Sequence, residues 1–108
     1  MTEVPAIPAH AVPVDAVLLD VREPDEWAAG HVEGAAHIPM GDLPGRLAEL
    51  PSADPLHVIC RSGQRSGQVV RWLQQQGVPS VNVGGGMQAW AAAGRPMVSD
   101  SGTSPVVA

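Results

Sequence analysis

The sequence predicts an α/β domain built on a mainly parallel sheet. Short apolar runs alternate along the chain with segments of helical spacing, which is typical of repeated strand–helix units. The 108 residues, 44% of them hydrophobic, suffice for one compact domain with a modest core. We expect this single domain to cover residues 1–98. Residues 99–108 are small and polar and are expected to form a flexible C-terminal tail.

The first two predicted strands differ in their place in the sheet. Val4–Ile7 is expected at an edge, because Pro5 and Pro8 cannot donate hydrogen bonds to a central ladder. Val17–Val21 is apolar enough to be buried on both faces. Pro8 and Pro13 interrupt the chain between these strands, so we expect a turn or a shortened helix there.

The next third of the chain predicts a helix, a strand and a second helix. Arg22–Gly30 has proline and acids in its first turn and ends on glycine, which indicates a helix of about two turns. Ala36–Ile38 is a candidate short strand. Asp42 can cap a helix that Pro51 stops, and three leucines at helical spacing would share its buried face: Leu43, Leu47 and Leu50.

Leu56–Ile59 is a predicted strand that ends on the only cysteine, Cys60. A helix over Ser66–Gln76 follows it and stops at Gly77.

The last predicted strand is Val81–Val83, and a helix over Met87–Ala93 closes the domain. Between them lies Gly84–Gly86, which lacks the glycine spacing and the downstream acid of a dinucleotide-binding fingerprint. We interpret these glycines as a tight turn close to Cys60.

Composition excludes several classes of function. Lysine is absent, and six arginines face eleven acids, which gives a formal net charge of −5. The chain therefore lacks a basic nucleic-acid footprint, and an anionic membrane surface should repel it. No apolar stretch approaches the ~20 residues that span a bilayer. The single cysteine fits a reducing compartment, so a cytoplasmic location is expected.

The surroundings of Cys60 predict a reactive thiol. A strand that turns through glycine-containing sequence into a helix aims unpaired amides at the sulfur, and these favour the anion. Arg61 and Arg65 lie in the same turn. Positive charge at a helix N-terminus opposes the macrodipole, so the two arginines indicate an anionic ligand. A small buried core cysteine, the structural alternative, needs neither the arginines nor the glycine.

Other chemically active side chains favour structural roles. Asp20 and Arg22 end a strand, and we interpret them as a structural ion pair. The four histidines are scattered with no helical pairing, so neither a zinc site nor a base for the thiol is indicated: His10, His31, His37 and His57. The tryptophans fall on separate predicted helices, where packing is expected: Trp27, Trp72 and Trp90.

Three segments, in this order and spacing, resemble the rhodanese-like sulfurtransferases, specifically their small single-domain form. Asp20–Pro24 with Gly30–Ala35 and Ile38–Pro39 resembles the family's first signature, and Cys60–Ser66 resembles its active loop. The family's closing signature is resembled by a third group of residues: Gly85–Gly86, Trp90 and Gly94–Pro96. The likeness runs from about Val17 to Pro96. It implies a mainly parallel five-stranded sheet flanked by helices on both faces.

The resemblance also implies a ping-pong reaction. Cys60 would be the catalytic nucleophile, taking sulfur from an anionic donor such as thiosulfate and passing it, as a persulfide, to cyanide or another thiophilic acceptor. A thioredoxin-like protein or a sulfur-carrier protein could be that acceptor. No metal or organic cofactor is implied. The backbone amides from Arg61 through Arg65 would surround the sulfur. The implied substrate-binding residues are Arg61, Ser62, Gly63, Gln64, Arg65 and Ser66.

Two alternatives stay open at this point. Cys60 to Arg65 spans six residues, as in the sulfurtransferases, whereas the related phosphatases and arsenate reductases have one residue more. The shorter ring of amides suits a single sulfur atom better than a tetrahedral oxyanion. A docking module of the same fold that has no activity is the second alternative. The intact cysteine and both arginines favour the enzyme.

Overall fold

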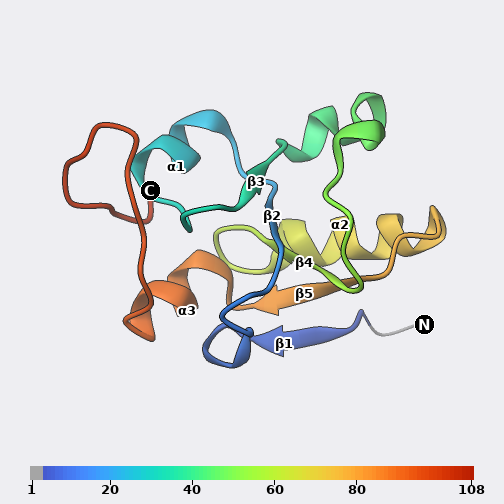
Figure 1. The fold of residues 1–108 in the computed structure, drawn as a ribbon, viewed down its shortest axis with the longest axis horizontal. Coiled ribbons are helices and arrows are strands. Elements are labelled where there is room, and N and C mark those ends of the chain that lie inside the picture. The colour runs from blue at the N-terminus through green and yellow to red at the C-terminus, as the bar shows by residue number, and fades with distance from the viewer. Residues whose placement is uncertain (1–3) are drawn as a thin grey trace.

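A computed structural model describes residues 4–108 and contains one sheet of five parallel strands (Figure 1). The strands lie in the order β1-β5-β4-β2-β3, and every pairing between neighbours is parallel. Their bounds are β1 Ala6–Pro8, β2 Leu18–Asp20, β3 Ala36–His37, β4 Leu56–Ile59 and β5 Ser80–Gly84. The predicted α/β class and parallel sheet are confirmed.

The strand that carries Cys60 lies at the centre of the sheet. β4 pairs with β2 on one side and with β5 on the other, and all four of its residues are buried. The predicted strand Leu56–Ile59 is therefore confirmed, and the predicted strand at Val17–Val21 is observed as the shorter β2. Because all strands run in parallel, their carboxyl ends meet at one edge, where Cys60 follows β4.

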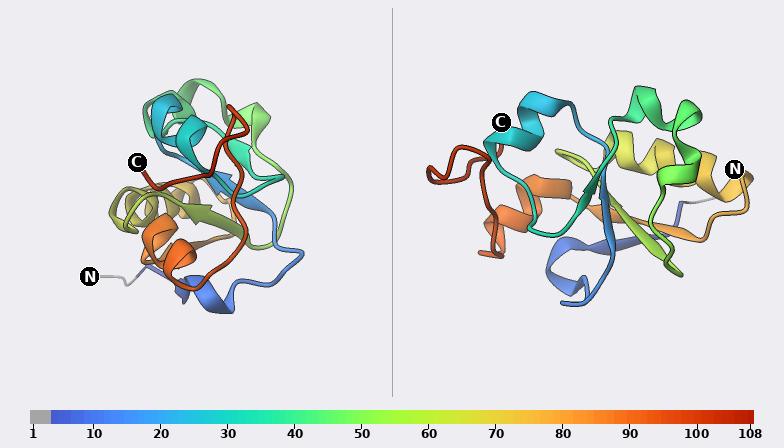
Figure 2. Two further views of the ribbon diagram at one scale, coloured as in Figure 1. Left: turned by 90° about the vertical axis from the view of Figure 1, so that its left-hand side faces the viewer. Right: turned by 45° about the horizontal axis from the view of Figure 1, so that its top comes forward.

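Helices cover both faces of the sheet, as Figure 2 shows. Their bounds are α1 Pro24–Ala29, α2 Gln64–Gln75 and α3 Gly86–Ala92. On one face α2 buries Val69, Val70 and Leu73 in the core cluster that also holds Cys60. On the other face Met87 and Trp90 of α3 pack against Ile59 and Val83. The thiol thus lies at the carboxyl end of a strand that is packed between two hydrophobic core clusters.

The N-terminal region matches its predicted role as a sheet edge. β1 lies at the edge of the sheet and pairs with β5. A 3₁₀ turn, Ala9–Ala11, follows it, where a turn or a shortened helix was expected. Arg95 fixes this turn by donating to the carbonyl oxygens of Ala9 and Val12, each at 2.8 Å.

The helix predicted after Asp42 is wrong. The chain forms two 3₁₀ turns instead, Met40–Gly45 and Leu47–Glu49, and Asp42 lies inside the first rather than capping a helix. Pro44 cannot continue an α-helical ladder, and Gly45 follows it, so the leucine spacing is realised in two short turns. The three leucines still face the α2 core, with Leu43 buried and Leu47 and Leu50 packed against it.

Residues 99–108, expected to be a flexible tail, lie beside α1 in both ribbon views (Figures 1 and 2). The amide of Asp100 donates to Ala28, and that of Val106 donates to Ala29, both at 3.0 Å. A Cβ atom added at Gly30 would overlap the backbone of Val106. The tail therefore runs directly over the end of α1.

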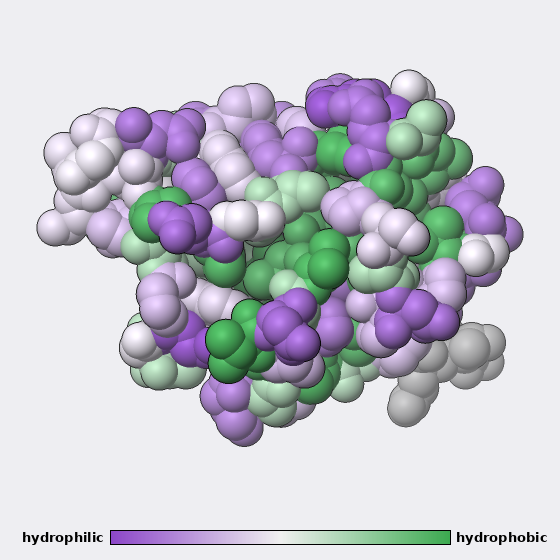
Figure 3. Space-filling view, in the orientation of Figure 1, coloured by the Kyte–Doolittle hydropathy of each residue, from purple (hydrophilic) through white to green (hydrophobic). Residues whose placement is uncertain are grey.

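Apolar side chains gather at the middle of the face drawn in Figure 3. A groove of about 400 Å³ runs between the segment before β2, the segment before β3 and the end of α3, and Leu18, Val32 and Trp90 contribute to its lining. None of its lining residues belongs to the segment 60–66. Within residues 4–108, no helix has the length and apolar character needed to cross a membrane.

Candidate functional site

The segment Cys60–Ser66, called here the Cys60 loop, connects β4 to the first turn of α2. It turns at Gly63, whose φ of 101° lies in the left-handed region that favours glycine. Cys60 and Ser66 are buried, whereas Arg61, Ser62 and Gln64 are exposed around them. The loop therefore forms a shallow ring with a thiol at its base.

Hydrogen bonds converge on the sulfur of Cys60. The amide of Gly63 donates to Sγ at 3.1 Å, and the Ser66 hydroxyl lies 3.2 Å from the same atom. Burial raises the pKa of the thiol and is the largest single influence on it. Hydrogen bonds from the Ser66 hydroxyl and from the amides of Ser66, Gly63 and Ser62 together outweigh burial, so the pKa lies below its usual value. The loop thus favours the thiolate, the reactive form of cysteine.

Asn82 of β5 orients the loop from the neighbouring strand. Its Nδ2 donates to the Gly63 carbonyl oxygen at 3.0 Å, which leaves Oδ1 as the acceptor of the Ser66 hydroxyl at 2.6 Å. A hydroxyl has one proton and cannot donate to both Oδ1 and Sγ. We expect the Ser66 hydroxyl to turn from Oδ1 to the sulfur when Cys60 ionises, because a charged acceptor forms the stronger hydrogen bond.

The start of α3 holds the loop in place through backbone hydrogen bonds. The amide of Met87 donates to the Cys60 carbonyl at 2.8 Å, and that of Gln88 donates to the Arg61 carbonyl at 3.0 Å. A Cβ atom at Gly86 would lie 2.6 Å from the Arg61 oxygen and closer still to that of Cys60. The predicted proximity of the Gly84–Gly86 turn to Cys60 is confirmed, and glycine is required by this close approach.

The two loop arginines have different surroundings. Arg65 donates through both terminal nitrogens to Glu26 of α1, with Nη1–Oε1 at 2.7 Å and Nη2–Oε2 at 2.8 Å. Arg61 is exposed and donates from Nε to the backbone oxygen of Ala108 at 3.0 Å. The sequence indicated two equivalent cations, but the structure pairs one of them with a carboxylate.

A buried ion pair anchors α1 beside the loop. Asp20 and Arg22 are fully buried, and Arg22 Nη2 lies 2.8 Å from Asp20 Oδ2. The same guanidinium donates to the carbonyl oxygens of Glu26 and Gly30, one within α1 and one directly after it. The structural interpretation of Asp20 and Arg22 is confirmed, and through α1 the pair fixes the position of Glu26.

The carboxylate of Glu26 makes folding stability sensitive to acid. Hydrogen bonds from Arg65 outweigh partial burial and lower the pKa of Glu26 from 4.5 to about 2. A carboxyl group with a depressed pKa stabilises the folded state above its unfolded pKa, and this contribution disappears as the pH falls from about 4.5 to about 2. We expect a loss of about 1–2 kcal/mol, because the pair is partly exposed and screened.

Urea denaturation of the wild type and Glu26→Gln between pH 7 and pH 2.5 measures this dependence. The difference in unfolding free energy between the two proteins should shrink as the pH falls. A difference that is constant with pH would show that Glu26 titrates normally.

Of the predicted loop residues, Ser62, Gly63 and Ser66 donate hydrogen bonds to the Cys60 sulfur, and no histidine of residues 4–108 does so. His31 and His37 instead stack on Trp27, with ring centroids 3.6 and 4.6 Å apart. Sequence reasoning missed Glu26 and Asn82 as neighbours of the loop. Asn82 carried a weak signal, since asparagine is depleted in strands and here lies between two valines.

The chain matches one protein family and is similar in sequence to several proteins. The family described as rhodanese-like domain matches residues 8–93. YtwF of Bacillus subtilis is 46% identical over 79 residues, covering 73% of this chain and 77% of that protein. An Allochromatium vinosum protein named a sulfurtransferase is 42% identical over 89 residues, covering 82% of this chain and 83% of that protein.

A solved structure shows the same arrangement of strands and helices. The crystal structure of a rhodanese-related protein from Thermoplasma volcanium has a TM-score of 0.81 and 34% sequence identity to this chain. It covers 87% of this chain and 97% of the other. These relatives support sulfur transfer, in general terms, as the activity of such a domain.

Proposed function

Because the chain belongs to the rhodanese-like domain family, we propose that it is a sulfurtransferase working through a persulfide on Cys60. The donor is thiosulfate or a similar carrier of sulfane sulfur, and the acceptor is cyanide, a thiol or a protein. One observation carries the proposal: the Cys60 sulfur sits buried at the base of a ring that lowers its pKa through hydrogen bonds from Gly63 and Ser66.

The proposed first step is a displacement at sulfur. The Cys60 thiolate attacks the outer sulfur of thiosulfate, a new S–S bond forms, and the old S–S bond breaks with its electron pair leaving on sulfite. In the second step the acceptor attacks the outer sulfur of the persulfide, and Cys60 leaves as the thiolate. No net oxidation of the protein occurs over the cycle. The same ring of donors can hold the negative charge on thiolate and persulfide alike.

The loop residues take separate roles in this scheme. Cys60 is the nucleophile, Ser66 and the amides of Ser62 and Gly63 stabilise its anion, and Arg61 receives the anionic end of the donor at the exposed rim. Gln64 lines the same rim. Arg65 donates to Glu26, so its charge is offset by a carboxylate.

The size of the ring favours sulfur over phosphate. Cys60 to Arg65 is a span of six residues, and the ring directs its donors at one atom rather than at the three oxygens of a phosphoryl group. The exposed loop leaves room for the acceptor to be a protein, either thioredoxin-like or a sulfur carrier, and a reducing cytoplasmic setting would keep the lone thiol free.

Sulfur transfer from thiosulfate to cyanide, followed as thiocyanate formation, tests the proposal. The wild type should turn over, Cys60→Ser should lose at least about 10³-fold, and Ser66→Ala should lose about tenfold because it removes one donor to the anion. Folding of each variant is checked by circular dichroism. A folded wild type that transfers no sulfur to cyanide, thiols or a sulfur-carrier protein would favour a docking module. Hydrolysis of a phosphoryl substrate would favour a phosphatase.

A further inference from the structure

The positive charge of Arg65 is already paired before any donor arrives. Glu26 meets it with two parallel hydrogen bonds of 2.7 and 2.8 Å, the geometry that gives the strongest carboxylate–guanidinium pairs. The Glu26 side chain is 15% exposed and that of Arg65 is 33% exposed. The pair is therefore only partly screened by solvent, and Glu26 occupies both terminal nitrogens of the guanidinium.

Glu26 is held in place independently of Arg65. Its Oε1 accepts the amide of Glu23 at 2.9 Å in the capping box of α1, and Arg22 donates to its backbone oxygen. The carboxylate is thus built into the start of a helix that the buried Asp20–Arg22 pair fixes to the sheet. Releasing Arg65 toward a donor would require breaking both bonds to a preorganised acceptor.

Arg61 provides the contrast, because it is exposed and, among residues 4–108, its side chain makes one hydrogen bond, to the backbone oxygen of Ala108. The loop therefore offers an anionic donor one available cation, while a fixed carboxylate stands beside the other. A dianion suffers more from this carboxylate than a monoanion does, because Coulomb energy scales with the charge of the donor.

We propose that Glu26 is a specificity-determining residue that disfavours highly charged small sulfur donors, because its carboxylate offsets the positive charge of Arg65 and repels them. The inference rests on the proposed sulfur transfer and deepens it. The favoured donors carry less negative charge than the thiosulfate dianion, such as the persulfide of a thiol or of a protein. There the Cys60 thiolate attacks the outer sulfur, the S–S bond breaks, and the donor thiol leaves as a thiolate.

Glu26→Gln removes the charge and retains the shape, so it tests the proposal with two donors that share one chemistry. Thiosulfate is a dianion and methanethiosulfonate is a monoanion. In both, the transferred sulfur is bonded to an oxidised sulfur, which leaves with the electron pair of the broken S–S bond as sulfite or methanesulfinate. If removing the carboxylate raises kcat/KM about threefold per unit of donor charge, thiosulfate gains about tenfold and methanethiosulfonate about threefold. Both gains should shrink in 0.5 M salt, and most of the change should appear in KM.

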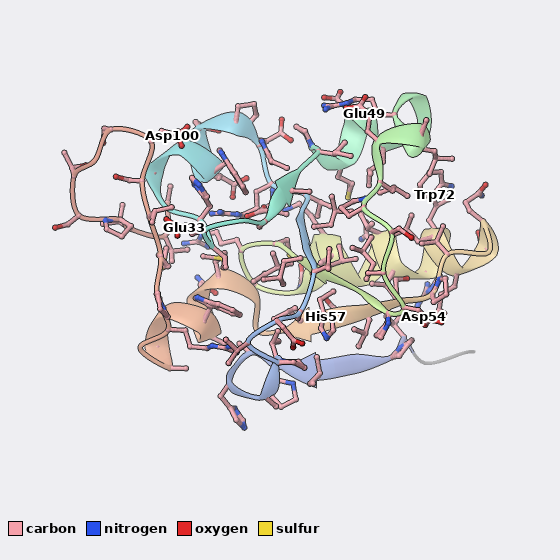
Figure 4. The ribbon with its side chains drawn as sticks, viewed as in Figure 1. Glu33, Glu49, Asp54, His57, Trp72 and Asp100 are labelled. Carbon is pink, nitrogen blue, oxygen red and sulfur yellow. The ribbon has the colours of Figure 1, made fainter. Side chains whose placement is uncertain are left out.

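Glu49→Gln is the matched control. It removes an equal charge from the exposed Arg46–Glu49 pair, whose Nη2–Oε1 distance is 2.8 Å, at a place remote from α1 (Figure 4). Neither donor should respond to it. Equal losses for both donors in Glu26→Gln, or no change in their ratio, would overturn the proposal and leave Glu26 a structural residue.

A second readout separates this proposal from the sulfur transfer on which it rests. Alkylation of Cys60 by iodoacetate, an anion, and by iodoacetamide, which is neutral, needs no sulfur chemistry. Glu26→Gln should raise the ratio of the two rates about threefold. A raised ratio in a protein that takes no sulfur from any donor would contradict the proposed function alone. An unchanged ratio in a protein that does transfer sulfur would contradict only the role of Glu26.

Discussion

Gly86→Ala is expected to destabilise the protein by about 3 kcal/mol and to slow sulfur loading of Cys60 by about 10²-fold. The added Cβ would meet the carbonyl oxygens of Cys60 and Arg61, which are backbone atoms and cannot rotate away. At φ 57° the residue also lies in the left-handed region, where alanine costs about 1 kcal/mol. The loop and α3 must therefore separate, which displaces the sulfur from its donors.

Gly94→Ala is the matched control for this prediction. Gly94 also has a positive φ, 72°, but no atom lies within 4 Å of the position that a Cβ would take. It should cost about 1 kcal/mol in stability and leave sulfur loading unchanged. Urea denaturation and the rate of sulfur loading are measured on both variants. Similar behaviour of the two would mean that the contact between α3 and the loop is unimportant.

Asp20→Asn is expected to lower the free energy of unfolding by about 3–5 kcal/mol, because it leaves the buried Arg22 charge without a counter-ion. Both side chains are fully buried, and Asp20 accepts three hydrogen bonds from the guanidinium and one from the Arg22 amide. The variant should also loosen α1, since Arg22 holds that helix through Glu26 and Gly30. Sulfur loading should then fall with stability.

Denaturation in urea at pH 7 measures the effect, with Glu49→Gln as the exposed counterpart. Arg46 and Glu49 lie at the surface, so breaking their pair should cost no more than about 1 kcal/mol. A cost for Asp20→Asn as small as that for Glu49→Gln would show that the Asp20–Arg22 pair does not anchor the fold.

The parts of the fold that follow from local pattern were predictable from sequence. The apolar run Leu56–Ile59 has the length of a buried strand, and it is one. The proline and glycine that bound α1 mark its ends correctly. The predicted helix after Asp42 does not form, although the leucines have helical spacing. Pro44 cannot continue an α-helical ladder, and this backbone restriction outweighs the side-chain pattern.

The ring around Cys60 was predictable because all of its members come from one segment. Glu26 was not, because its partner Arg65 is 39 residues away and the pairing exists only once Arg22 has fixed α1. The acids at the start of α1 indicated only the first turn of a helix, and nothing local distinguishes an acid that favours the helix start from one that forms an ion pair across the site. Contacts of the 99–108 segment with α1 were likewise hidden, because its small polar residues carry no periodic signal.

Intact-mass measurement after incubation with thiosulfate tests the central claim most directly. The wild type should gain the mass of one sulfur atom on Cys60, and the gain should disappear on treatment with cyanide or dithiothreitol. Cys60→Ser should gain nothing under the same conditions. A folded wild type that gains no sulfur from thiosulfate or from a persulfide donor would contradict the account.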